Sequence, residues 1–105
     1  MQKYQGDVGA IAIKEAPKID FGPLPENGLI IAEGEVTGHK HVLVADREAV
    51  VEFGRDERGV YVVNVKDGQA KLVHGKHDIQ VLERGIWAMP VQYEYDDEED
   101  RRTLD

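Results

Sequence analysis

The sequence predicts an all-β protein, built as a single-domain antiparallel sandwich or small barrel of about eight short strands. Three observations lead to this fold class. No stretch of the 105 residues places apolar side chains at helical spacing over three turns. Short segments rich in Val and Ile recur at intervals of about ten residues. Gly, Asp and Pro residues, which favour turns and loops, separate these segments.

The expected strands combine β-branched or aromatic residues with boundaries at turn-forming residues. In chain order they are Val8–Lys14, Leu29–Val36, His41–Val44, Ala49–Phe53, Val60–Val65, Ala70–Val73, Ile79–Leu82 and Ile86–Tyr95. The segment Ala16–Asn27 contains Pro17, Pro23 and Pro25. Because proline has no N–H to donate, this segment cannot pair continuously in a sheet and is expected to be a loop.

Three turns are expected between the later strands. Arg55–Gly59 predicts a hairpin loop, and Glu83–Gly85 predicts a second turn. Asp67-Gly68 predicts a tight type I′ turn, in which both central residues have positive φ.

The last strand carries an alternating apolar stripe, so we expect one of its faces to lie in the core. The side chains expected to be buried are Trp87, Met89, Val91 and Tyr93. Pro90 interrupts the donors of this strand, which predicts an edge strand or a bulge. An edge as long as Ile86–Tyr95 would favour a homodimer formed by strand pairing between two copies.

The charge distribution limits the partners. With 13 basic and 21 acidic residues the chain carries a net charge of −8, so we expect no affinity for nucleic acid. No apolar run has the length of a membrane span, and we expect no membrane partner. The chain lacks cysteine and its N-terminus is too polar for a signal peptide, which favours a cytoplasmic location.

The last ten residues differ in composition from the rest. Six acids against two arginines leave this segment with a net charge of −4, half the total. Such a charge run is typical of a solvated chain end. The expected organisation is therefore one β domain over residues 1–95 and an acidic C-terminal tail over residues 96–105.

All four histidines fall in two pairs, His39/His41 and His74/His77. Residues i and i+2 of a strand share a face, so His39 and His41 should project together. His74 and His77 lie between two expected strands, where Gly75 allows the chain to bend. If the two pairs meet, four imidazoles could hold one divalent transition metal, with Zn, Ni or Fe the plausible ions. Four ligands would close the site, whereas three would leave a position for water.

Two alternatives stand beside this hypothesis. His41 could pack half-buried while His74 and His77 lie solvated in a polar turn. The domain would then be a metal-free protein-interaction module that uses its loop, sheet edge or acidic tail to bind an unknown partner. Neither hypothesis decides whether the protein is an enzyme. The chain lacks a Ser-centred nucleophile elbow, a Walker loop and a dinucleotide fingerprint, so acyl-transfer and nucleotide chemistry have no support.

Four ordered motifs give the chain a resemblance to a known group. They are Gln5-Gly6-Asp7-Val8, the segment from Ala32 to His41, His74-x-x-His77, and Gln92-x-Glu94-Tyr95 followed by Arg101-Arg102. In this order they resemble a group of small uncharacterised bacterial and phage-associated proteins. The chain departs from that pattern at Gly9-Ala10, at Lys76 where the group favours an acid, and at Tyr93 where it favours arginine. The resemblance supports the motif positions and implies no reaction.

Overall fold

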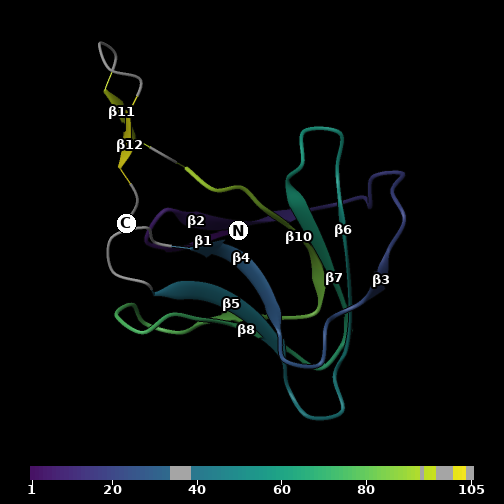
Figure 1. The fold of residues 1–105 in the computed structure, drawn as a ribbon. Coiled ribbons are helices and arrows are strands. Elements are labelled where there is room, and N and C mark those ends of the chain that lie inside the picture. Colours follow the sequence, from purple (N-terminus) through teal and green to yellow (C-terminus); the bar gives the residue numbers. More distant parts are fainter. Residues whose placement is uncertain (34–38, 93, 97–100, 104–105) are drawn as a thin grey trace.

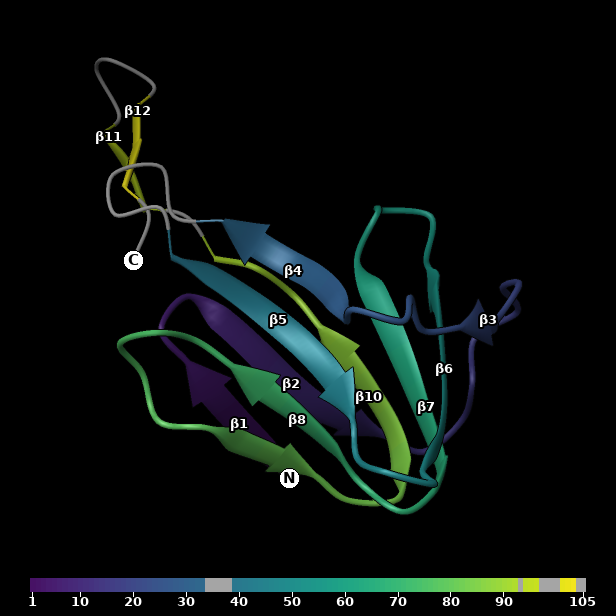
Figure 2. The ribbon, with the colours of Figure 1, turned by 60° about the horizontal axis from the view of Figure 1, so that its bottom comes forward.

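The protein is a sandwich of two antiparallel sheets (Figures 1 and 2). The computed structural model describes residues 1–33, 39–92, 94–96 and 101–103, the last two stretches as backbone only. These residues form twelve strands, and none of them is helical. The predicted all-β sandwich is therefore confirmed. The described part of the chain also holds no helix that could cross a membrane.

The larger sheet has six strands. Their spatial order is β1 (Gln2–Gln5), β2 (Val8–Ile13), β10 (Gly85–Met89), β7 (Tyr61–Asp67), β6 (Val50–Arg55) and β3 (Gly22–Pro23). The smaller sheet has four strands in the order β4 (Leu29–Glu33), β5 (Lys40–Ala45), β8 (Ala70–Val73) and β9 (Gln80–Leu82). A separate ladder pairs β11 (Glu94–Asp96) with β12 (Arg101–Thr103), so it crosses the boundary predicted between the domain and the tail. Residues 97–100 and 104–105 of that tail lie outside the described part.

The core lies between the two sheets and contains side chains from both. Trp87 and Met89 are buried as predicted, and they pack with Leu43, Leu72 and Val63. Val91 is half-buried against this core. The prediction for Tyr93 falls outside the described residues.

The prediction of one edge strand over Ile86–Tyr95 is wrong for Ile86–Met89, which belong to β10, and Glu94 and Tyr95 belong to the separate strand β11. Strand β10 lies inside the six-stranded sheet, between β2 and β7. Pro90 is tolerated because its carbonyl still accepts a hydrogen bond from the Gly9 N–H at 2.9 Å. The ladder loses only the reciprocal bond, and pairing resumes between Val8 and Val91. The edge on which the expected homodimer depended is therefore not present at this strand.

The interpretation of the turns needs a similar correction. Arg55–Gly59 does connect the paired strands β6 and β7. Asp67-Gly68, by contrast, leads from β7 in the six-stranded sheet to β8 in the four-stranded sheet. Of this pair only Gly68 has a positive φ, 74°, so the turn is not type I′. Glu83–Gly85 also crosses between sheets, from β9 to β10.

Strand β1 was not predicted. It forms a hairpin with β2 in which Gln5 pairs with Val8 and only Gly6-Asp7 intervene. Gly6 has a φ of 56°, as the first central position of a two-residue type II′ loop requires. The short, polar sequence of β1 conceals the strand, but the hairpin fixes the position of Gln5.

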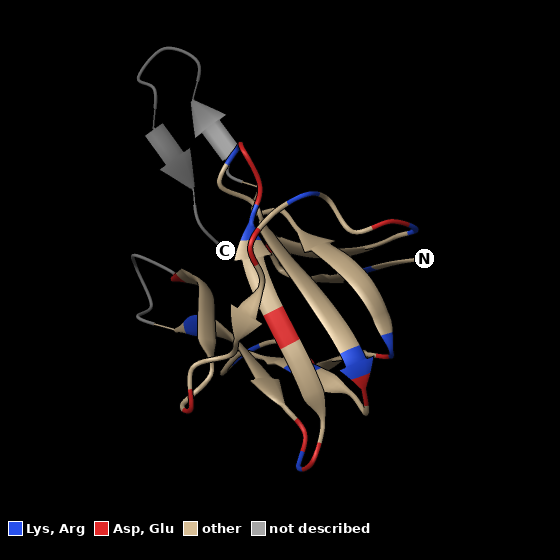
Figure 3. Ribbon diagram, turned by 90° about the vertical axis from the view of Figure 1, so that its right-hand side faces the viewer, with Lys and Arg blue, Asp and Glu red and all other residues tan. Residues whose placement is uncertain are grey.

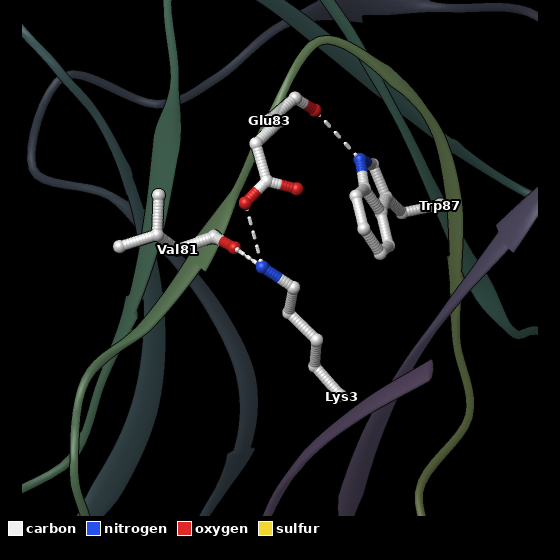
Figure 4. Close-up of polar contacts among 4 residues, drawn as sticks. All are labelled: Lys3, Val81, Glu83 and Trp87. Carbon is white, nitrogen blue, oxygen red and sulfur yellow. Dashed lines mark hydrogen bonds and ion pairs between the residues drawn. The ribbon is translucent and has the colours of Figure 1, made fainter. Parts of the chain in front are cut away.

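A lysine joins the two sheets along the side formed by β1 and β9 (Figure 4). The Lys3 ammonium donates to the backbone carbonyl of Val81 and lies 2.7 Å from the Glu83 carboxylate. The Trp87 indole donates to the Glu83 carbonyl at 2.9 Å, and the Lys3 ammonium lies 5.7 Å from the centre of the Trp87 ring. These contacts close the sandwich on this side.

Candidate functional site

The pairing of β5 with β8 brings the two histidine pairs together. Val42 is the partner of Val73 in this antiparallel ladder. One step further along the same register, His41 stands opposite His74, the residue that directly follows β8. His39 lies just before β5, and His77 lies in the bend that leads to β9. Both pairs therefore lie at the same end of the four-stranded sheet.

The four imidazole rings form one contiguous group, here called the histidine cluster (His39, His41, His74 and His77). The centre of the His74 ring lies 4.3 Å from that of His41, 4.6 Å from His77 and 5.5 Å from His39. The ring centres of His41 and His77 are 5.9 Å apart. His41 is 2% and His74 7% exposed, while His39 and His77 are half-buried. The alternative in which His74 is solvated in a polar turn is therefore wrong.

Gly75 allows the two segments to pack this closely. A Cβ atom at this position would stand 2.4 Å from Cδ2 and 3.0 Å from Nε2 of the His39 ring. Such a contact is far inside van der Waals distance, so any larger residue would displace the ring. The glycine expected for a bend is in fact needed because the His39 ring lies against the backbone.

Gln5 reaches from the six-stranded sheet into the histidine cluster and is 2% exposed. Its Nε2 donates to the carbonyls of Leu72 at 2.8 Å and Asp78 at 2.9 Å. Carbonyls only accept, so the amide orientation is fixed and Oε1 faces Nδ1 of His41 at 2.9 Å. His41 must then donate from Nδ1, which leaves the lone pair of its neutral ring on Nε2. An outer hydrogen bond of this kind commonly orients a metal-binding histidine.

In His74 the Nδ1 atom accepts a hydrogen bond, whereas in His41 it donates one. His74 Nδ1 accepts this bond from the backbone N–H of Lys76 at 3.0 Å. A neutral His74 ring with this bond carries its proton on Nε2. Within the described residues, no three His, Asp or Glu side chains already have the arrangement of a metal site. The histidine cluster is thus a packed group of rings. In His41 the lone pair of the neutral ring is on Nε2, whereas in His74 it is on Nδ1 and accepts the hydrogen bond from Lys76.

Sequence reasoning identified the four histidines but not the role of Gln5. The Gln5-Gly6-Asp7-Val8 motif was noted only as a point of resemblance. Its physical signal is the tight Gly6-Asp7 loop, which holds Gln5 at the end of a short strand. Spacing in the sequence could not show that Gln5 contacts β8, because Gln5 and Leu72 lie 67 residues apart.

A family model described as a domain of unknown function (DUF8820) matches residues 4–92. The match spans both sheets and includes Gln5 and all four histidines. No curated protein and no solved structure matches the chain significantly.

Proposed function

The chain belongs to the DUF8820 family of domains of unknown function, and we propose that it binds one divalent transition metal ion at the histidine cluster. Zinc, nickel and iron are the ions that suit an imidazole-rich site. The observation that carries the proposal is the gathering of four imidazole rings from two separate segments around His74.

The spacing of the rings fits a metal. A ligating imidazole nitrogen lies about 2.0–2.1 Å from zinc, and tetrahedral ligation then puts neighbouring ring centres about 5 Å apart. The ring-centre separations of 4.3, 4.6, 5.5 and 5.9 Å bracket this value.

The individual ligands should differ in importance. His41 is already oriented by Gln5, and the lone pair of its neutral ring is on Nε2. His39 and His77 are half-buried, so an ion can approach them from solvent. Recruiting His74 costs its hydrogen bond to the Lys76 N–H. Three histidines with a water would leave an open coordination position, and entry of His74 would close it.

The test is metal binding by protein without a histidine tag, freed of metal by a chelator. Titration calorimetry with Zn²⁺ and Ni²⁺ should give one ion per chain. The absorption spectrum of bound Co²⁺ would report the ligand geometry. H41A should weaken binding by about 100-fold or more and H39A by a similar factor, whereas H74A should have a smaller effect.

The matched control is K76A, because Lys76 lies in the same bend but its side chain is exposed. It should bind metal as tightly as the wild type. Dichroism spectra of each variant would establish that it is folded. Binding that is absent in the wild type, or equal in H41A and K76A, would reject the proposal and leave a metal-free interaction module as the better description.

A further inference from the structure

A cavity lies away from the histidine cluster, beside the β6–β7 hairpin. Its volume is about 280 Å³, and its lining includes Ile31, Met89 and Val91 from the core and Arg55, Arg58 and Tyr61 from the hairpin. Strand β4, which contributes Ile31, is the end strand of the smaller sheet. Pairing of β10 with β7 ends at Met89 and Tyr61, and the hairpin projects beyond this point (Figures 1 and 2). We call this cavity the arginine pocket.

The arginine pocket combines an apolar floor with a cationic rim. Its accessible apolar surface comes from the half-buried Val60, Tyr61 and Val91, while Ile31 and Met89, which also line it, are buried in the core. Arg55 and Arg58 are exposed, and no carboxylate is among the described lining residues. Figure 3 shows that charged residues gather mainly at strand ends and hairpins, while most of each strand is uncharged. Two cations around a cavity are distinctive in a chain of net charge −8.

Both arginines are held in place by the hairpin. The Arg55 guanidinium lies 4.3 Å from the centre of the Tyr61 ring and donates to the Tyr61 hydroxyl. Asp56 Oδ1 accepts from the backbone N–H groups of Arg58 at 2.8 Å and Val60 at 3.0 Å. The Asp56 Oδ2 atom lies 3.2 Å from the Arg58 guanidinium. Each guanidinium has about five N–H donors, so these contacts leave donors on both for an anion.

We propose that the arginine pocket binds a small organic carboxylate with an apolar body, such as a single-ring aromatic acid or a short-chain aliphatic acid. The carboxylate accepts charge-assisted hydrogen bonds from Arg55 and Arg58, a geometry that suits the planar guanidinium. The apolar body covers the half-buried side chains of Val60, Tyr61 and Val91. The cavity is at the small end of the range for ligand sites, about 300–1,000 Å³, which excludes long lipids. This proposal is independent of metal binding at the histidine cluster.

The experiment is a titration of metal-free protein with phenylacetate and hexanoate, followed by amide NMR shifts. Phenylacetamide is the neutral match of the first ligand, and inorganic phosphate tests an anion without an apolar body. The acids should shift the amides of Ile31, Tyr61 and Val91 in a saturable manner. The amide and phosphate should bind at least about tenfold more weakly.

Variants separate the arginine pocket from general charge attraction. The Arg58 side chain is 80% exposed, so R58Q should leave the fold intact while lowering affinity by about tenfold. R84Q removes another exposed arginine, from the β9–β10 turn outside the pocket, and should not change affinity. Equal binding of phenylacetate and phenylacetamide, equal affinity of R58Q and R84Q, tight binding of phosphate, or the absence of saturation would each overturn the proposal.

Discussion

The histidine cluster and the arginine pocket use polar side chains in opposite ways. In the histidine cluster, His41 and Gln5 are almost fully buried, and Gln5 joins the cluster to two backbone carbonyls. In the arginine pocket, Arg55 and Arg58 are exposed, and their hairpin is held by its own Asp56. A change in the histidine cluster should therefore alter stability and ligand binding together. A change at Arg55 or Arg58 should alter ligand binding without altering stability.

The largest effect on stability is expected from Gln5→Leu. This change removes three hydrogen bonds and leaves the Leu72 and Asp78 carbonyls and His41 Nδ1 without their Gln5 partner. Unfilled buried hydrogen-bonding groups cost about 1–3 kcal/mol each, so we expect unfolding to become easier by about 3 kcal/mol. Urea denaturation would measure the loss. Metal affinity should also fall, because the His41 tautomer is no longer fixed.

Gln2→Leu is the matched control, since Gln2 is an exposed residue of the same strand. It should change the free energy of unfolding by less than about 0.5 kcal/mol. If Gln5→Leu were as stable as Gln2→Leu, the amide would not be the link between the sheets that its contacts indicate.

Gly75→Ala should have an intermediate effect. The added methyl group would meet the His39 ring at 2.4 Å, so the ring or the bend must move. Overpacking of this kind costs about 1–3 kcal/mol, and displacement of His39 should weaken metal binding. Gly22→Ala is the comparison, because a Cβ there meets nothing within 4 Å. Equal stability and metal affinity in the two variants would show that the His39 ring is not held against Gly75.

How far the sequence predicts the molecule differs between these regions. The alternation of apolar residues predicted the sandwich and the burial of Trp87 and Met89 correctly. The same period of two predicted that His39 and His41 project together, although His39 lies just before β5. It could not establish that β5 pairs with β8, because β6 and β7 intervene in the chain and belong to the other sheet. The meeting of the histidine pairs thus depended on non-local pairing, which local spacing does not specify.

The errors have the same origin. Pro90 indicated an edge because proline lacks a donor, yet the residues before it form β10, which pairs on both sides, and Pro90 follows the end of that strand and accepts from Gly9. Asp67-Gly68 indicated a tight type I′ turn, but only Gly68 has a positive φ and the turn carries the chain between sheets. Gln5 was missed because its partners Leu72 and Asp78 lie far away in the sequence. The arginine pocket was missed because its lining combines the β6–β7 hairpin with residues of β4 and β10. Local chemistry specified the elements, and tertiary pairing specified the sites.

The smallest effect is expected from acidification, which should alter the β6–β7 hairpin that carries Arg55 and Arg58. Burial alone would raise the pKa of the Asp56 carboxyl, but hydrogen bonds from Val60 and Arg58 outweigh it and lower the pKa below the ordinary 3.8. A lowered pKa in the folded state means that the carboxylate stabilises the hairpin above the ordinary value, and that this contribution is lost as the pH falls through the lowered pKa. The amide NMR signals of Arg58 and Val60 should therefore shift below pH 3.8.

Asp56→Ala should abolish this transition and leave the global unfolding curve nearly unchanged, whereas Glu57→Ala, an exposed neighbour, should retain it. Movement of these two amides at the same pH in Asp56→Ala would contradict the assignment of the transition to Asp56, and a large loss of global stability would contradict the independence of the β6–β7 hairpin from the core.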